Sequence, residues 1–329
     1  MRVFLVTFLA ALGGAVAAAP AGTLDLQGHR GARGLAPENT LAGFAAALGI
    51  GVTTLEMDLA VTRDGAVIVV HDQRLSPDLA RTPEGRWIDP PAPAIATLTL
   101  AELKRFDVGR IRPGTRYAAQ HPQQRALDGA TIPTLAEVVA LVREAGNQTV
   151  RFNLETKLSP LAPELAPGPE AFARAVVDVV QREDIASRTT IQSFDWRSLR
   201  AVQALAPRIA LGCLSAEQRW FDTIGRGRAG ASPWTAGLDI DQFGGDVAAL
   251  AAAAGCDSWS PHAGDVDQEA VRSAHRHGLR VVVWTVNDPA GMARLIELGV
   301  DGIITDYPDR LRAVMAERSL TLPAPTPVE

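Results

Sequence analysis

The feature that most constrains the fold is a regular alternation of short apolar segments and amphipathic segments in the C-terminal half of the chain. Strand patterns are expected at residues 149–154, 189–192, 209–214, 258–260, 280–286 and 302–305. Helix patterns fall between most of them, at residues 170–182, 196–205, 247–253, 268–277 and 289–298. Repeated strand–helix units of this length predict a mostly parallel sheet covered by helices.

The N-terminal half adds strands to this sheet. Residues 24–27 form a short apolar strand pattern, residues 41–48 a helix pattern, and residues 55–72 the pattern of a hairpin. One hairpin arm among the strand candidates fits a distorted (β/α)8 TIM barrel with an antiparallel arm better than it fits an open sheet. Residues 73–130, rich in Pro, Arg and Asp, are expected to be an inserted segment over one face.

The hairpin carries a dense group of ionisable residues. Asp64, followed by glycine between two apolar runs, is a strong two-strand turn signal. A turn centred on Arg63 and Asp64 would pair residues whose numbers sum to about 127, which places His71 opposite Glu56. Asp58 would share a face with Glu56, two residues along the strand. A slip of one residue would turn His71 to the opposite face.

The first residues have the pattern of a secretory signal. Arg2 precedes an apolar run at residues 3–16, and small residues follow at 17–21. The run is shorter than the roughly 20 residues of a membrane-spanning helix, and no Cys near its end indicates a lipid anchor. We expect an exported protein, periplasmic or secreted, without a stable membrane anchor; an uncleaved anchor is the alternative. The expected divisions are a signal peptide at 1–21, the barrel at 22–318 and a flexible tail at 319–329.

The composition is that of a globular enzyme, with 47% hydrophobic and 21% charged residues. The net charge of −5 and the lack of a basic block argue against nucleic acid as a partner. Cys213 and Cys256 could pair in an oxidising compartment, but two buried free thiols fit the sequence equally well. The composition leaves the oligomeric state open.

Polar residues gather where the barrel strands are expected to end, which is where TIM barrels place their active sites. Glu56, Asp58 and Glu155 are three oxygen donors on neighbouring strands. Hard cations such as Ca²⁺ and Mg²⁺ prefer such ligands, and no thiol or His-rich cluster accompanies them to favour zinc. The sequence therefore predicts one divalent metal ion. The alternative is a metal-free network of these acids with Arg30 and Lys157.

Two histidines are expected beside these acids. His29 ends the first strand, and His71 ends the hairpin. The unperturbed pKa of histidine is about 6.5, so two such side chains flanking a reacting group can act as general base and general acid. Arg30 and Lys157 bring positive charge suited to a phosphoryl oxygen. Two further residues at strand ends, expected to contact substrate, are Gln192 and Trp284.

A series of motifs runs in a specific order along the chain. They are His29-Arg30-Gly31, Pro37-Glu38-Asn39-Thr40, Glu56-x-Asp58, Asp64-Gly65, His71-Asp72, Glu155-x-Lys157, Trp284-Thr285-Val286-Asn287 and Asp301-Gly302-Ile303-Ile304-Thr305-Asp306-Tyr307-Pro308. Each is weak alone, but in this order the set resembles the glycerophosphodiester phosphodiesterases. The resemblance covers about residues 24–315. It implies a distorted TIM barrel that hydrolyses glycerophosphodiesters to sn-glycerol 3-phosphate and an alcohol.

The resemblance also implies a role for each site residue. By this resemblance, the acid/base pair is His29 and His71, and the ligands of a divalent metal are Glu56, Asp58 and Glu155. The phosphate would contact Arg30 and Lys157, and Trp284 would border the glycerol. The chain departs from the commonest pattern in its insertion at 73–130 and in the long segment at 215–245. That segment carries four aromatic residues, which suit either a wall for the alcohol or plain packing: Trp220, Phe221, Trp234 and Phe243.

The expected function is metal-dependent hydrolysis of small glycerophosphodiesters. The nucleophile is either water or the neighbouring glycerol hydroxyl, which would form a cyclic phosphate that water then opens. One alternative is a phospholipase-type diesterase acting on lyso or intact lipids, although the tail at 319–329 offers no membrane-binding helix. The other is an exported barrel that binds phosphoesters without turnover, and the presence of both histidines and all three acids argues against it.

Overall fold

The computed structural model describes residues 23–328, which form the predicted closed barrel. Its eight parallel strands are β1 (Asp25–Gly28), β2 (Thr54–Val61), β4 (Arg151–Thr156), β5 (Thr189–Ser193), β6 (Ala210–Ser215), β9 (Ser258–Pro261), β10 (Arg280–Val283) and β11 (Gly302–Thr305). Each strand pairs with the next in this order, and β11 pairs with β1 to close the ring. The distorted (β/α)8 barrel is thus confirmed. The predicted signal peptide lies outside the described residues.

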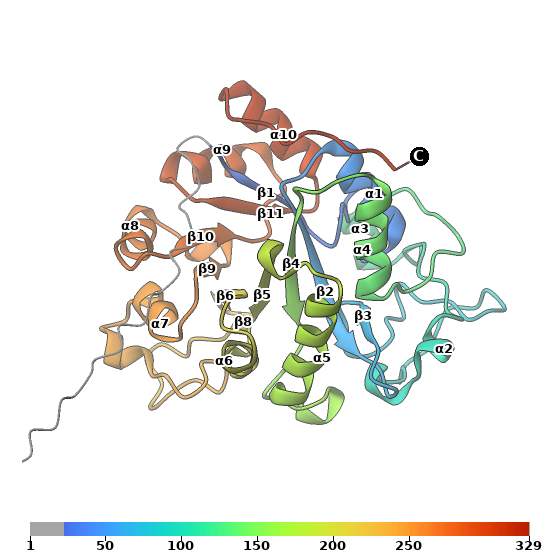
Figure 1. Ribbon diagram of the computed structural model, residues 1–329, viewed down its shortest axis with the longest axis horizontal. Coiled ribbons are helices and arrows are strands. Elements are labelled where there is room, and N and C mark those ends of the chain that lie inside the picture. Colours follow the sequence, from blue (N-terminus) through green and yellow to red (C-terminus); the bar gives the residue numbers. More distant parts are fainter. Residues whose placement is uncertain (1–22, 329) are drawn as a thin grey trace, which may run out of the picture.

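Helices surround the barrel (Figure 1). They are α1 (Leu41–Ile50), α4 (Leu135–Glu144), α5 (Pro169–Arg182), α6 (Trp196–Leu205), α7 (Val247–Ala253), α8 (Gln268–Arg276), α9 (Pro289–Leu298) and α10 (Pro308–Glu317). Side-chain caps define several starts: the Thr40 hydroxyl accepts from the Gly43 N–H, and Thr134 and Glu137 form a reciprocal capping box. Short 3₁₀ turns lie at Pro163–Leu165, Ala186–Arg188, Ile240–Phe243 and Ala263–Asp265.

The hairpin register differs from the prediction by one residue. β3 (Val67–Val69) pairs antiparallel with β2 so that residue numbers sum to 128, as in Leu59 with Val69. The turn has three residues rather than two. The Thr62 N–H donates to the Ala66 carbonyl and closes the loop, and Gly65 within it adopts a φ of 82°. The expected pairing of His71 with Glu56 is therefore wrong.

The inserted segment packs on the outer side of this hairpin. It contains the 3₁₀ turn Ile95–Thr97 and two short helices, α2 (Leu100–Leu103) and α3 (Arg116–Gln120). A capping box of Thr99 and Glu102 starts α2. A small apolar cluster joins the insertion to the hairpin through Ala60 and Ile68. Figure 1 shows the segment beside β3 and α4.

A disulfide joins Cys213 to Cys256, which settles the two possibilities that the sequence left open. The Cα atoms are 5.9 Å apart, within the usual range for a disulfide. Cys213 lies in β6, and Cys256 lies two residues before β9, the neighbouring strand. The bond therefore links adjacent strands of the barrel and restricts the conformations that the unfolded chain can adopt.

The C-terminal segment is packed rather than flexible, contrary to expectation. The Thr326 N–H donates to the Leu48 carbonyl, and the Asn147 amide donates to the Thr326 hydroxyl. Leu320 and Leu322 pack against the core, and this apolar contact holds the segment beside α1 (Figure 1). Among the described residues, no helix has the length and apolar character needed to span a bilayer.

Candidate active site

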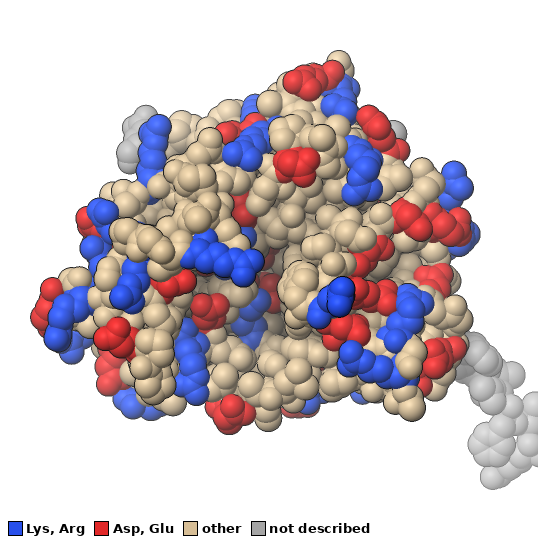
Figure 2. All heavy atoms as spheres, turned by 180° about the vertical axis from the view of Figure 1, so that it is seen from behind, with Lys and Arg blue, Asp and Glu red and all other residues tan. Residues whose placement is uncertain are grey.

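The nine predicted site residues come together at the C-terminal ends of the barrel strands. Eight of them line one cavity of about 920 Å³: His29, Arg30, Glu56, His71, Glu155, Lys157, Gln192 and Trp284. The ninth, Asp58, lies at its edge, where Oδ1 is 3.7 Å from the Lys157 ammonium. A hollow with acidic and basic atoms inside it is visible near the centre of the face in Figure 2.

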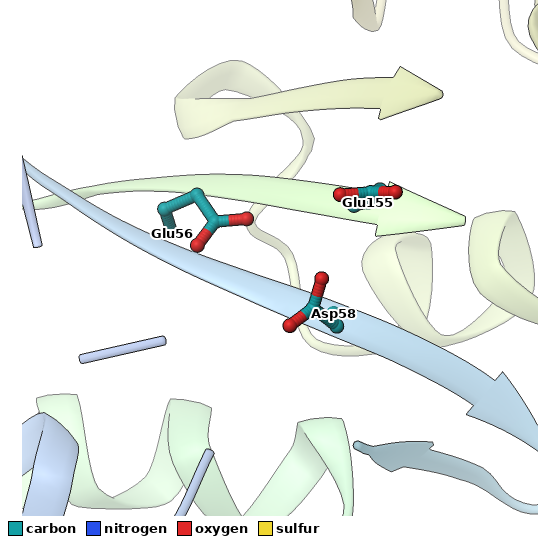
Figure 3. A group of neighbouring side chains, drawn as sticks. All are labelled: Glu56, Asp58 and Glu155. Carbon is teal, nitrogen blue, oxygen red and sulfur yellow. The ribbon is translucent and has the colours of Figure 1, made fainter. Parts of the chain in front are cut away.

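Three carboxylates lie together at this site. Glu56 and Asp58 are two residues apart on β2 and therefore share a face, and the parallel register pairs Asp58 with Glu155 on β4. One oxygen from each lies within 4.8 Å of the others, and all three groups are buried. Figure 3 shows them pointing toward a common space between the two strands.

The electrostatics of this trio fit a bound cation. Burial, and then the charge of Asp58, raises the pKa of Glu56 well above its usual range. Burial also raises the pKa of Glu155 to about 7. The positive charge of Lys157 opposes this rise, and the negative charge of Asp58 adds to it. Although burial opposes it, the pKa of Asp58 falls below its ordinary value beside Arg30, His71 and Lys157.

One buried oxygen of the trio lacks a hydrogen bond. Asp58 Oδ1 is buried and has no hydrogen-bond partner in the described chain, whereas Asp58 Oδ2 accepts from the Asn39 amide at 2.9 Å and lies 3.1 Å from Arg30 Nε. A buried carboxylate oxygen without a partner is costly unless a cation or water contacts it. The donor set is all oxygen, so the residues present fit one divalent hard cation.

His29 is held by a chain of polar contacts. Its Nδ1 lies 2.6 Å from Asp306 Oδ1, and Arg33 binds both oxygens of Asp306 at 2.9 and 3.0 Å. The Asn287 amide donates to Asp306 Oδ2 at 2.7 Å. Burial, and then the Arg33 charge, lowers the pKa of His29 to about 3. With Nδ1 engaged, Nε2 faces the acids and lies 3.9 Å from Glu56 Oε2.

His71 has the same arrangement on the other side of the cavity. Its Nδ1 lies 2.6 Å from Asp72 Oδ1, which leaves Nε2 free of this contact. The ring lines the cavity although the hairpin register is one residue from the expected one, because β3 ends at Val69 and the chain leaves the ladder after Val70. Burial, and then the charges of Arg30 and Lys157, lowers the pKa of His71.

The two predicted phosphate-binding cations are anchored by carboxylates. Arg30 has a left-handed φ of 50°, and its backbone N–H donates to Glu56 at 2.9 Å. Its guanidinium donates to Glu38 at 2.7 Å. Lys157 Nζ donates to Glu155 at 2.7 Å. Each cation keeps further N–H groups that can reach an anion in the cavity.

Gln192 and Trp284 occupy different parts of the same cavity. The Gln192 amide donates to Glu56 at 3.1 Å and accepts from Asn153 at 3.0 Å, so its first role here is to orient an acid. Trp284 donates from Nε1 to the Ser260 carbonyl at 2.9 Å. Its ring meets that of Phe194 edge-on at 5.2 Å.

An aromatic wall forms one side of the cavity. It consists of Phe194, Trp220, Phe221, Trp234 and Trp284. Three of these rings come from the long segment after β6, where β7 (Glu217–Gln218) and β8 (Phe221–Asp222) form a small hairpin. Phe243, the fourth aromatic residue of that segment, packs against the main core instead.

Sequence reasoning missed the residues that hold the candidate catalytic groups. Four of them belong to motifs already noticed, although the pattern did not indicate their contacts: Glu38, Asn39, Asp72 and Asp306. Arg33 and Tyr117 carried no signal in the sequence. Tyr117, on α3, donates from its hydroxyl to Glu38, and the same hydroxyl lies 3.4 Å from Arg33 Nη1.

Comparisons with known proteins agree on one kind of relative. The family model described as the glycerophosphoryl diester phosphodiesterase family matches residues 29–310. Glycerophosphodiester phosphodiesterases of Caldanaerobacter subterraneus subsp. tengcongensis and Bacillus subtilis are 30% and 31% identical, over 86% and 87% of this chain and 94% and 84% of theirs.

Two solved structures extend the comparison to three dimensions. A protein from Silicibacter pomeroyi DSS-3 has a TM-score of 0.81 and 34% identity, with 92% of this chain and 96% of that one covered. An Oleispira antarctica phosphodiesterase, solved in complex with the product sn-glycerol-3-phosphate, has a TM-score of 0.63 and 25% identity, with coverages of 88% and 96%.

Proposed function

The chain belongs to the glycerophosphoryl diester phosphodiesterase family, and from that premise we propose that it hydrolyses glycerophosphodiesters to sn-glycerol 3-phosphate and an alcohol by two-histidine catalysis. One observation carries the proposal. His29 and His71 each have Nδ1 on a carboxylate, at 2.6 Å, and both line the cavity together with Glu56 and Glu155 of the acidic trio. A carboxylate on Nδ1 fixes the ring and its tautomer, so that Nε2 is the atom that exchanges a proton.

The two Nε2 atoms supply the proton transfers. In the first half, one histidine takes the proton of the glycerol 2-hydroxyl as its oxygen bonds to phosphorus. The bond from phosphorus to the other alcohol breaks, and the second histidine protonates the departing oxygen. In the second half the roles reverse: water loses a proton to the second histidine, and the first protonates the glycerol oxygen as the cyclic ester opens. Direct attack by water is the alternative, and it uses each histidine once.

The charged side chains stabilise the phosphoryl group. Arg30 and Lys157 donate their remaining N–H groups to its oxygens. Glu56, Asp58 and Glu155 hold one divalent cation, Ca²⁺ or Mg²⁺. When bound, that cation neutralises charge that develops on the phosphodiester.

We also propose that the protein is exported, to the periplasm or outside the cell. The signal-like pattern at residues 1–21 supports this. The disulfide between Cys213 and Cys256 adds an independent argument, because structural disulfides persist mainly in oxidising compartments.

A substrate panel tests the proposed reaction. We expect sn-glycerol 3-phosphate to be released from at least one of glycerophosphocholine, glycerophosphoethanolamine and glycerophosphoglycerol. Release should stop with a chelator and return with added Ca²⁺ or Mg²⁺, because the trio needs its cation. A substrate methylated on the glycerol 2-hydroxyl should be inert if the cyclic ester forms, and its full turnover would establish direct attack by water. No product from any diester with metal present would contradict the function and favour a binding barrel.

A further inference from the structure

We propose that the alcohol released from the preferred substrate carries an uncharged apolar group, such as an alkyl chain. This inference rests on the proposed function. Glycerol is a polar triol, so it does not account for a cavity whose walls are mainly apolar. The other alcohol of the diester is then the part that the apolar walls fit.

Two apolar walls face the space beside the catalytic groups. The aromatic wall is the first. The second is aliphatic and comes from the insertion and from the loop after β4: Leu75, Pro77, Pro90, Pro91, Leu158 and Leu165. Both walls belong to the same cavity as His29 and His71, so a group bonded to the reacting phosphorus lies within their reach. A cavity of about 920 Å³ is also near the upper end for drug-sized ligands.

The cavity mouth is apolar as well. Trp220, which lines the cavity, is 67% exposed at the turn between β7 and β8. Large apolar side chains exposed beside a cavity are more costly than the same residues buried, unless an apolar ligand covers them. Trp220 therefore extends the aromatic wall toward solvent.

The charges along the lining disfavour a cationic alcohol such as choline or ethanolamine. The carboxylates that line the cavity are Glu56, Glu155 and Asp72. The first two belong to the acidic trio, and Asp72 is engaged by His71. Lys157 Nζ already lies 5.9 Å from the Phe194 ring centroid, and Arg74 adds another positive charge to the lining. The aromatic wall offers a quaternary ammonium cation–π attraction, but Lys157 and Arg74 in the same lining repel that charge, whereas an alkyl chain meets the apolar surface without this repulsion.

A chain-length series tests this inference. We expect kcat/KM for sn-glycero-3-phospho-octanol to exceed that for the matched ethanol diester by about 10-fold or more, because even one methylene in a fitted apolar pocket changes kcat/KM by about that factor. The choline diester should be no better than the ethanol diester. Trp220→Ala should reduce the ratio of kcat/KM for the octanol diester to that for the ethanol diester at least about 3-fold. Leu127→Ala, at a leucine that is also exposed but does not line the cavity, is the matched control.

The outcomes separate this inference from the proposed function. Equal kcat/KM for the ethanol and octanol diesters, or a preference for the choline diester, would overturn the apolar assignment while leaving the reaction in place. Failure of every diester to react would instead refute the reaction itself. A retained octanol advantage in Trp220→Ala calls for the same measurement in Leu158→Ala, and an advantage retained in both would also overturn the assignment.

A separate set of contacts leads us to infer that Tyr117 is a positioning residue. Its hydroxyl donates to Glu38, which holds Arg30 at 2.7 Å, and lies 3.4 Å from Arg33, which holds Asp306. The Tyr117 ring stacks on His121 at 4.7 Å, and the Gln124 amide donates to the Arg33 carbonyl at 2.7 Å. One side chain of the insertion thus joins the support of the phosphate-binding arginine to that of His29.

Tyr117→Phe keeps the stacked ring and removes only this link. We expect kcat to fall about 10-fold with little change in the melting temperature, because the supports loosen while packing is kept. In a double variant with Glu38→Gln, the losses should not add, since both substitutions break the same chain. The control is Tyr307→Phe, with unchanged kcat expected. Unchanged kcat in Tyr117→Phe, or fully additive losses, would overturn the positioning role.

Discussion

Replacing either His29 or His71 by alanine should lower kcat by at least about 10²-fold, the usual loss for a general acid or base. Each ring has one nitrogen fixed on a carboxylate, so alanine removes a proton carrier that is already oriented. Water can enter the space, but it lacks that orientation. KM should change less than kcat, because the proton transfers belong to the transition state. The measurement is steady-state turnover of a glycerophosphodiester with metal present.

The two histidines should also prove interdependent. If they act in the same step, the double variant should lose far less than the product of the two single losses. His277→Ala is the control, since that histidine is exposed at the end of α8 and should leave kcat unchanged. Near-normal kcat in both single variants would contradict the acid/base assignment. A loss confined to one of them would leave a single-histidine mechanism.

The barrel was predictable because its local signals agree with its global pattern. Thr134 and Glu137 form a capping box that marks the start of α4, and the β11 strand was placed to the residue by its apolar run before Asp306. The predicted strand at 280–286 ends instead at Val283. There the Trp284 indole turns to bond the Ser260 carbonyl, a long-range contact that no local pattern reveals.

The register of the hairpin could not be predicted from the local sequence. Asp64-Gly65 correctly located the turn, but Gly65 with a left-handed φ fits either a two-residue or a three-residue loop. The three-residue loop moved the register by one position, which should have turned His71 away. His71 still lines the cavity because β3 is only three residues long, so the ladder does not fix its direction.

The supports of the site could not be derived because they join distant parts of the chain. Asp306 meets His29 across 277 positions, and Tyr117 meets Glu38 across 79. The motifs named Asp306 and Glu38 without indicating their partners. Nothing in the insertion distinguished Tyr117 from any other aromatic residue, since its importance lies in where α3 docks.

The acidic trio leads to the second large effect: Asp58→Asn should abolish binding of the divalent cation and, with it, turnover. Asp58 Oδ1 is the buried oxygen without a hydrogen-bond partner, and the amide removes its charge with almost no change in volume. In the unsubstituted protein, adding Ca²⁺ or Mg²⁺ at 100 times its Kd should stabilise the fold by about 2.7 kcal/mol. That corresponds to a melting-temperature rise of about 5 °C.

The thermal shift separates cation binding from catalysis. Asp58→Asn should begin from a lower melting temperature, because Arg30 and Lys157 lose a charged partner, and should show no rise with either metal. Asp178→Asn removes one negative charge from an exposed position on α5 and should keep the full rise. A full rise in Asp58→Asn would place the cation elsewhere. No rise in the unsubstituted protein, with activity insensitive to chelator, would mean that Arg30 and Lys157 alone neutralise the acids.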